Sequence, residues 1–418
     1  MEANNKTWCE RDEHHEFEYY LDFNRWLDLA DEESAGVLLQ SHGLENIRQP
    51  SKALFASDKP AYDMAFREYR IQRRNEVLSR ELLEAIGGDD HWYNRNEERF
   101  LQLVGELRQK TVVPFVGAGI SVAAGFPTWK DHLRQQGKTA GIANGKVENL
   151  LEAGKYEQVI HTIEEKLNAD VFAQEIRDVF QKKLDPPEVV YLLTQLFGDT
   201  LITTNYDQLI ETAYQNINAK PVQLINATVA EERPDGQSLS VVKLHGHINI
   251  PQRCIISANQ YDLAYGQGEV DLSLPIPKLL GHHYRNSSLL FLGCSLNNDR
   301  TIQVFRKVKG QMPDVDRPQH FSIEQAPNDV NELTQRNASL LELGITPIWY
   351  EQGNYESVEA LLQHAKHEVE YQGGFITPRA LITDASGFDE NERGEMDKSR
   401  AVTELFNKIK TILLFTKK

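Results

Sequence analysis

The sequence has little cysteine, and its cysteines are badly placed for cross-linking. Its 418 residues contain three, Cys9, Cys254 and Cys294, which lie far apart and form no C-x-x-C pair. Any disulfide scheme leaves one of them unpaired, so the pattern disfavours a disulfide-stapled secreted fold and predicts a reducing, cytoplasmic location. The doublets His14-His15 and His282-His283 lack cysteine or carboxylate residues at the spacing of metal ligands, and adjacent residues point apart. No metal site is expected from them.

Long apolar runs and excess positive charge are also missing. No stretch approaches 18 uncharged apolar residues, and the first 20 residues show no basic-then-apolar signal pattern, so no membrane partner is expected. With 45 Lys and Arg against 62 Asp and Glu, the net charge of −17 disfavours sequence-independent binding to nucleic-acid phosphates. The 40% hydrophobic content is enough to bury a core. We expect a globular protein that binds no nucleic acid directly.

The chain divides into parts by its hydrophobic period. Residues 1–98, with stretches such as FEYYLDFNRWLDLADEE, predict a helical N-terminal region. Residues 373–395 are rich in glycine and acidic residues and predict a linker, and residues 396–418 predict a C-terminal helix with an apolar stripe. A neighbouring subunit could cover that stripe, which favours a homo-oligomer, although packing within the chain remains open.

Residues 99–372 alternate short apolar runs with helical patterns. The predicted strands are TVVPFV, DTLITT, VVKLH, SSLLFLG, HFSIE and ITPIWY, and stretches such as VENLLEAGKYEQVIHTIEEKL have the spacing of amphipathic helices. Strands that alternate with helices predict a parallel sheet covered on both faces. The expected fold class is therefore α/β, a Rossmann-like sheet with helical additions at both ends.

The stretch TVVPFVGAGIS, residues 111–121, places a glycine-rich turn directly after a predicted strand. Backbone amides in such a turn can face a pyrophosphate at the carboxyl end of the strand. A lone G-x-G can equally well do no more than close a strand-to-helix turn. The stretch departs from G-x-G-x-x-G because Gly125 comes late, and no GxxxxGK[ST] occurs, so an ordinary dehydrogenase and a P-loop ATPase are both disfavoured.

Three further motifs follow their own predicted strands. They are Asn205-Tyr206-Asp207, His245-Gly246 and Gly293-Cys294-Ser295. The carboxyl ends of parallel strands lie at one edge of a sheet, so we expect these motifs to meet the glycine turn there. Taken singly, an asparagine after a strand is more often a turn residue, and a strand-end histidine is usually just hydrogen-bonded.

Five motifs in this order resemble the sirtuin family. They are GAGIS, GFPTWK (125–130), TTNYD, HG and GCS, and the resemblance covers roughly residues 103–350. It implies a Rossmann-like domain that takes NAD as its substrate and cleaves the nicotinamide–ribose bond.

Residue types at these motifs suit that chemistry. Cleavage leaves positive charge on the ribose, so a neutral amide such as Asn205 can hold sugar hydroxyls or a water, and His245 can accept a proton as general base. These two are the predicted catalytic residues. The resemblance places Asp207 beside the reacting centre. The predicted NAD-binding residues are Gly117, Ala118, Gly119 and Ser121 at the phosphates, Gly293 and Ser295 at the adenosine half, and Trp129 and Asp207.

Two departures from sirtuins shape the expected reaction. Protein-deacylating sirtuins carry two cysteine pairs that hold a structural zinc, whereas only Cys254 lies between His245 and Cys294 here, so no zinc is expected. The segment that reads Gly-Ile-Pro-Asp-Phe-Arg in many sirtuins is GFPTWK. In those sirtuins the zinc module helps form the cleft that binds acyl-lysine. Without that cleft the remaining nucleophile is water, and the expected products are nicotinamide and ADP-ribose.

An unrestrained NAD hydrolase would exhaust the NAD of the cell, which implies that the enzyme is held inactive until it is triggered. Zinc-less sirtuin-like domains resemble effectors of bacterial anti-phage defence that deplete NAD, and this layout looks most like the partner of a HerA-type ATPase. Two alternatives stay open: a non-catalytic module that senses NAD or ADP-ribose, and an NAD-dependent protein deacylase. The trigger, the oligomer size and any preference for NADP cannot be read from the sequence.

Overall fold

A computed structural model describes residues 14–29, 34–217, 221–228, 237–250, 253–312 and 317–370. The chain divides into two compact units, Met1–Gly374 and Phe375–Lys418, and the described residues all belong to the first. The predicted linker at 373–395 and C-terminal helix at 396–418 lie outside the described residues. The boundary predicted after residue 98 stays a prediction as well, although one helix, α6 (Trp92–Arg108), runs straight across it.

The centre of the structure is a parallel sheet of seven strands. In chain order they are β1 (Val112–Val116), β2 (Thr200–Thr203), β3 (Val222–Asn226), β4 (Leu239–Lys243), β5 (Ser288–Leu292), β6 (His320–Gln325) and β7 (Ile345–Tyr350). They lie side by side in the order β3-β4-β2-β1-β5-β6-β7, and every pairing is parallel. This sheet confirms the predicted Rossmann-like α/β class.

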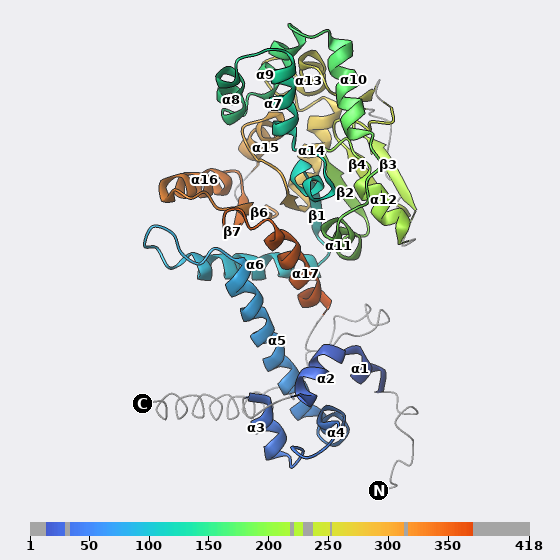
Figure 1. Cartoon of the computed structure of the whole chain (residues 1–418), viewed down its shortest axis with the longest axis vertical. Coiled ribbons are helices and arrows are strands. Elements are labelled where there is room, and N and C mark those ends of the chain that lie inside the picture. The colour runs from blue at the N-terminus through green and yellow to red at the C-terminus, as the bar shows by residue number, and fades with distance from the viewer. Residues whose placement is uncertain are drawn as a thin grey trace. The chain divides into compact units, whose positions relative to one another are not determined.

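Helices surround the sheet (Figure 1). Besides α6 they are α7 (Trp129–Thr139), α8 (Asn144–Glu152), α9 (Tyr156–Glu164), α10 (Ala169–Phe180), α11 (Glu188–Leu196), α12 (Leu209–Asn216), α13 (Ala258–Tyr265), α14 (Pro275–Asn286), α15 (Arg300–Gly310), α16 (Val330–Glu342) and α17 (Glu356–Glu370). Helix α11 packs against α12 and α17, and α17 packs against α6, whereas α14 packs against α15 and α16 against β7.

Strands β1 and β5 are hydrogen-bonded neighbours at the point where the strand order reverses. From β1 the chain moves outward through β2, and from β5 it moves outward on the opposite side. Both strands are buried, as their near-continuous apolar sequences require. In doubly wound sheets such a reversal opens a crevice at the carboxyl ends of the two strands.

All six predicted strands form, and the structure adds one strand and one helix boundary that the sequence did not predict. The edge strand β3 was missed, because its sequence VQLIN mixes polar residues with a half-exposed apolar face. The predicted helical stretch at 147–167 is two helices, α8 and α9. Gly154, with a positive φ of 69°, separates them because it adopts the left-handed conformation that ends a helix.

The described part of the N-terminal region is helical. It contains α1 (His14–Tyr19), α2 (Leu21–Asp28), α3 (Ser34–Ser41), α4 (Pro50–Ser57) and α5 (Lys59–Glu81). Rings from α2 and α5 pack together, with Phe23 against Tyr62 and Phe66 at centroid distances of 5.0 and 5.1 Å. A buried ion pair joins α5 to α17, with Arg70 Nη2 2.9 Å from Glu368 Oε2.

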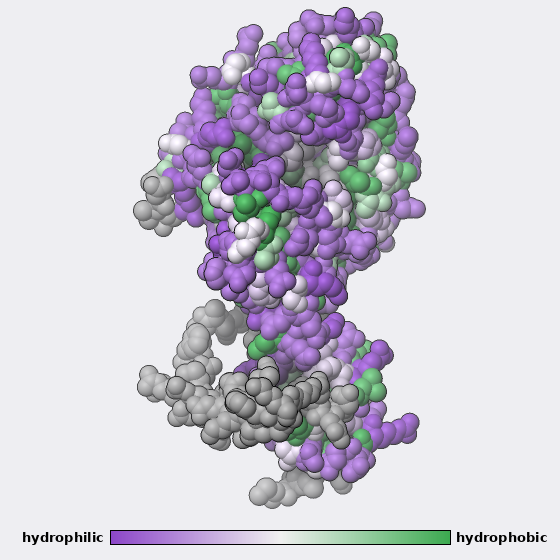
Figure 2. Space-filling view, turned by 60° about the vertical axis from the view of Figure 1, so that its left-hand side comes forward, coloured by the Kyte–Doolittle hydropathy of each residue, from purple (hydrophilic) through white to green (hydrophobic). Residues whose placement is uncertain are grey.

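The visible surface is mostly hydrophilic, and its hydrophobic residues form small separate groups (Figure 2). Among the described helices, none is long and apolar enough to cross a bilayer.

Candidate active site

A cavity of about 1110 Å³ opens over the carboxyl ends of the central strands. The structure brings all ten sequence-predicted site residues to its wall. They are Gly117, Ala118, Gly119, Ser121, Trp129, Asn205, Asp207, His245, Gly293 and Ser295. The convergence follows from the parallel sheet, because all of these residues except Trp129 lie in motifs that come directly after a strand.

The glycine turn forms the floor of the cavity. Gly117 follows β1 directly, and a 3-10 helix, η2 (Ala118–Ala124), begins at the next residue. A Cβ on Gly117 would lie 2.5 Å from the carbonyl oxygen of Gly293, and one on Gly119 would lie 2.9 Å from the Gly293 Cα. The two loops therefore touch backbone to backbone, which only glycine allows.

The amides of this turn are used inside the protein. Gly117 N donates to the carbonyl of Leu292 and Gly119 N to that of Gly293, both at 2.9 Å. These bonds lock the β1 loop to the β5 loop. The predicted phosphate role of Gly117 and Gly119 therefore rests on the space that their missing side chains leave, because these two N–H groups already have acceptors.

Asn205 is held firmly by its surroundings. Its Nδ2 donates to the carbonyl oxygen of Gly117 and contacts Ser121 Oγ, both at 3.1 Å. Its backbone amide donates to Thr203 Oγ1 at 3.0 Å. Both amide hydrogens are thus directed to Gly117 and Ser121, and the residue lines the cavity. Asn205 Oδ1 is buried and has no partner among the described residues.

Asp207 lies on the same network. Its Oδ2 accepts from Ser121 Oγ at 2.8 Å, and its Oδ1 accepts from Leu209 N at 3.1 Å, at the start of α12. Burial raises its pKa above the usual range, while Lys243 and the two hydrogen bonds oppose that shift. The carboxyl group thus orients Ser121 and, through it, Asn205.

His245 lies against two tyrosines of α13. Its Nε2 is 2.8 Å from the hydroxyl of Tyr265, and its Nδ1 is 3.5 Å from that of Tyr261. Burial lowers its pKa to about 4. The imidazole is therefore neutral at pH 7 and able to accept a hydrogen bond or a proton, but with a weaker driving force than an ordinary histidine.

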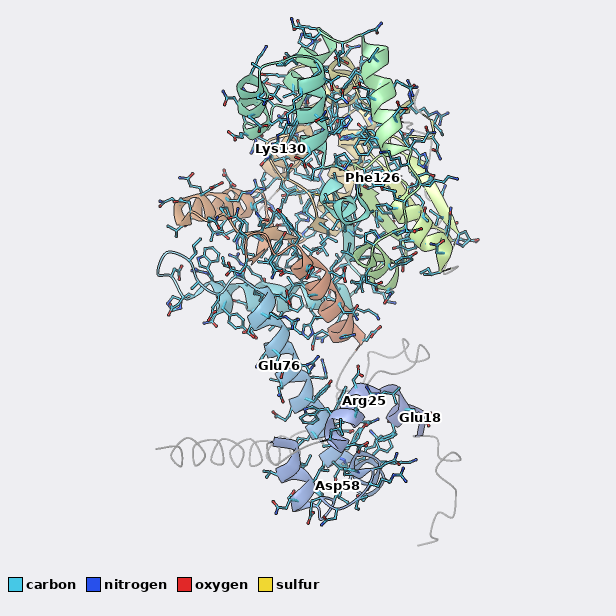
Figure 3. The ribbon with its side chains drawn as sticks, viewed as in Figure 1. Glu18, Arg25, Asp58, Glu76, Phe126 and Lys130 are labelled. Atoms are coloured by element: carbon cyan, nitrogen blue, oxygen red, sulfur yellow. The ribbon has the colours of Figure 1, made fainter. Side chains whose placement is uncertain are left out.

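The segment GFPTWK joins η2 to α7, and Figure 3 labels Phe126 and Lys130 within it. Thr128 caps α7 by accepting from Asp131 N at 3.0 Å, a role that the sequence comparison with sirtuins did not suggest. Trp129 stacks on His132 with centroids 5.5 Å apart and lies 5.7 Å from Tyr206. Trp129 and Tyr206 give this end of the cavity an aromatic wall.

The opposite wall is the loop between β5 and α15. Ser295 is exposed, and Leu296 has a positive φ of 45°, an uncommon value for leucine. Asp299 caps α15 by accepting from Ile302 N at 3.0 Å. Burial raises its pKa to about 6.

Sequence reasoning missed several polar residues around the cavity. Arg336 of α16 donates to the carbonyls of Ser295 and Leu296 and lies 3.5 Å from Glu324, whose pKa burial raises to about 7. Lys243 and Glu211 form a buried pair behind Asn205. Lys243 carried a signal, because a lysine inside the apolar run VVKLH must find partners in the interior. Arg336 carried none, since it comes from a helix far along the chain.

The described residues contain no group of three or more His, Cys, Asp or Glu side chains that could hold a metal ion. The expectation about zinc therefore rests on the cysteine count alone.

Residues 199–348 match the family model described as SIR2-like domain. This range includes Asn205, His245 and Gly293 but not the glycine turn. Two curated proteins named NAD(+) hydrolase ThsA are similar to the chain. The protein from Acinetobacter baumannii is 26% identical over 222 residues, 53% of this chain and 44% of the relative. The protein from Bacillus cereus is 22% identical over 287 residues, 66% of this chain and 58% of the relative.

The chain thus spans about half the length of the curated relatives it matches. The range that matches the family model contains three of the five sequence motifs, TTNYD, HG and GCS. Residues of all three motifs line the cavity. The structure therefore contains a region similar to a SIR2-like domain, folded around the site that the motifs predict.

Proposed function

We propose that the protein is an NAD hydrolase that uses water to release nicotinamide and ADP-ribose. The observation that carries the proposal is the clamped amide of Asn205, whose Nδ2 is engaged by Gly117 and Ser121 while its buried Oδ1 has no partner among the described residues. A fixed neutral acceptor in a cavity can bind a water or a ribose hydroxyl without repelling or trapping the positive charge of the reaction.

The reaction needs no group that the chain lacks. The C1′–N bond breaks with its electron pair going to nicotinamide, and a water oxygen bonds to C1′ as charge develops on the ribose. Asn205 holds that water or a ribose hydroxyl, and neutral His245 accepts the proton that the water loses, directly or through Tyr265. Because the pKa of His245 is low, we expect the positioning of the water or ribose by Asn205 to contribute more to the rate than proton transfer to His245.

Two further observations support the proposal. The similar curated proteins carry the name NAD(+) hydrolase. The only cysteine between His245 and Cys294 is Cys254, which is buried and donates to the His247 carbonyl. The four zinc-binding cysteines of the module that helps form the acyl-lysine cleft in deacylating sirtuins therefore have no counterpart in this stretch.

The proposal extends to a biological role. We infer a triggered cytoplasmic effector of anti-phage defence that depletes NAD, acting as a homo-oligomer and controlled by a HerA-type ATPase. It rests on the danger that free NAD hydrolysis poses to the cell and on the resemblance of the motifs.

The test follows nicotinamide release from NAD by the chain alone and with the product of its neighbouring gene. Asn205→Ala and His245→Ala should each lower release, while the exposed His161→Ala should not. Undiminished release in both site variants would show that the site is elsewhere. Removal of acyl groups from lysine peptides would favour the deacylase, and tight NAD binding without turnover in every assembly would favour the sensing module.

A further inference from the structure

We propose that Lys243 is a positioning residue, whose ammonium group fixes the backbone of Asn205 and Asp207 and thereby aims the Asn205 amide into the cavity. This role rests on the proposed function.

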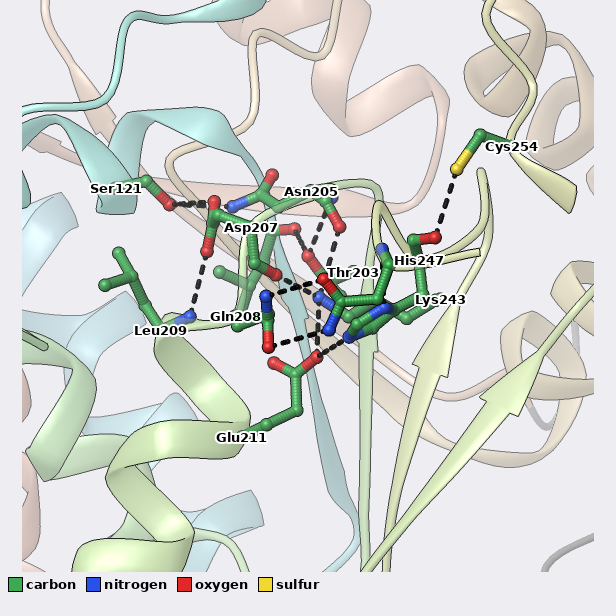
Figure 4. A network of polar contacts seen from close by, with 12 residues as sticks. Ser121, Thr203, Asn205, Asp207, Gln208, Leu209, Glu211, Lys243, His247 and Cys254 are labelled. Carbon is green, nitrogen blue, oxygen red and sulfur yellow. Dashed lines mark hydrogen bonds and ion pairs between the residues drawn. The ribbon is translucent and has the colours of Figure 1, made fainter. Parts of the chain in front are cut away.

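Lys243 is placed to do this by the register of the sheet. It is the last residue of β4 and pairs with Thr203, the last residue of β2, so it lies beside the segment that leaves β2 toward the site. The side chain is 1% exposed. Its Nζ donates to the carbonyl oxygen of Asn205 at 3.3 Å and to that of Asp207 at 2.5 Å (Figure 4).

The two backbone carbonyls that Lys243 contacts lie in a segment whose other printed bonds are made mainly by its side chains. Residues 204–208 belong to no helix or strand, so their carbonyls lack the regular bonds of a ladder. An ammonium group has three donors. Lys243 directs two of them to this segment, and its ammonium group also forms an ion pair with Glu211, whose Oε1 is 3.0 Å away. One side chain thus ties the β2 loop to the first turns of α12.

Glu211 supplies the opposite charge. It is 4% exposed, and its Oε1 also lies 3.4 Å from His247 Nε2. Burial acts to raise the pKa of Glu211, but Lys243 and His247 outweigh it and hold that pKa below its usual range. The carboxylate therefore stays charged and balances the ammonium.

A contribution to stability does not by itself explain why the Lys243–Glu211 pair is buried. Two charges lose their hydration when they are buried, and replacing such a pair by neutral side chains is often neutral or stabilising. An apolar residue at 243 could fill the same space, but it could not bond two carbonyls of the loop that carries Asn205. What the charge of Lys243 specifically determines is the conformation of the loop that carries Asn205.

The experiment uses four variants in the activated assembly, with nicotinamide release as the readout. They are Lys243→Met, Glu211→Gln, the double variant, and Lys278→Met as a control on the exposed face of α14. The double variant matters most, since it removes both charges of the pair and leaves neither of these two ions buried without its partner.

The expected result is a split between kcat and KM. Lys243→Met and the double variant should lower kcat about 100-fold, as expected when a positioned group moves by about 1 Å, with KM changed by less than about threefold. Glu211→Gln keeps the ammonium and its two carbonyl contacts, so its kcat should fall by less than about fivefold. A double variant with wild-type kcat would overturn the proposal whatever its melting temperature, because the charge of Lys243 would then not position the site.

Hydrogen exchange at residues 205–209 separates this proposal from the proposed function. If the wild-type assembly releases no nicotinamide, the proposed function fails, and exchange alone decides the role of Lys243. Faster exchange in the double variant than in the wild type and Lys278→Met supports positioning. Equal exchange in all three overturns it.

Discussion

The two sides of the cavity are built differently. On the side of β1, β2 and β4, which we call the amide side, Ser121, Asn205, Asp207 and Lys243 are all buried and bonded to one another. On the side of β5 and β6, which we call the loop side, residues 293–299 include an exposed serine and a leucine with positive φ. There a single arginine, Arg336, holds two carbonyls.

The difference matches what each side is proposed to do. A reacting water or ribose must be held within a fraction of an ångström, and a buried network with few free donors provides such rigidity. Recognition of a nucleotide tail tolerates more movement, so a more exposed loop is sufficient. The comparison predicts that variants on the amide side change kcat and that variants on the loop side change KM.

The largest effect is expected where the two sides meet. Gly293→Ala should destabilise the protein by about 3 kcal/mol, because a Cβ would lie 2.5 Å from Ile120 N and φ is +64°. Urea unfolding measures the change. Gly125→Ala is the matched control, since its φ of +98° is also positive but its Cβ would meet nothing within 4 Å. Equal losses for both would mean that the loop contact is unimportant.

Ser121→Ala tests the amide side. The change removes the Ser121 Oγ bonds to Asn205 and Asp207, so the Asn205 amide loses a restraint. We expect kcat for nicotinamide release to fall about tenfold or more with little change in KM. Ser79→Ala on the exposed surface of α5 should behave as wild type. An increase in KM alone would contradict the assignment of this side.

Arg336→Gln tests the loop side. Without the guanidinium the carbonyls of Ser295 and Leu296 lose their anchor, and KM for NAD should rise about fivefold while kcat stays within about twofold. Arg73→Gln, which removes an exposed contact to Glu76 on α5, is the control. A fall in kcat at constant KM would mean that the two sides do not differ as described.

The smallest effect concerns acid stability near the aromatic wall. Burial lowers the pKa of His132 to about 4 against 6.5 for an unfolded chain. The unfolded state binds a proton below about pH 6.5 and the folded state only near 4, so stability is lost as the pH falls through this window. His132→Phe should recover up to about 1 kcal/mol at pH 5. Melting curves from pH 7 to 4.5 measure it, and exposed His161→Phe should give no recovery.

Sequence reasoning predicted the sheet well because buried parallel strands have distinctive sequences. TVVPFV and SSLLFLG are short apolar runs between turn residues, and both became central strands. The strand β3 was missed because an edge strand needs no continuous apolar run. Positions of the site residues were predictable for the same reason as the sheet, since each follows a strand whose end is fixed.

The partners of those residues were harder to predict. Arg336 reaches Ser295 across 41 positions of sequence, and nothing local in α16 marks it. His245 was expected to behave as a base near neutral pH, whereas its tyrosine neighbours from α13 bury it and lower its pKa to about 4. Such effects come from packing between distant segments, which motifs and periodicity do not encode.

The backbone contact between the glycine turn and Gly293 also has a thermodynamic consequence. Because amide-to-carbonyl bonds inside the protein shape the floor of the cavity, its conformational entropy is lost during folding and not when a ligand arrives. A ligand finds this floor already formed. Its affinity should therefore depend little on loop ordering, and control of the enzyme must act on other walls of the cavity or on access to it.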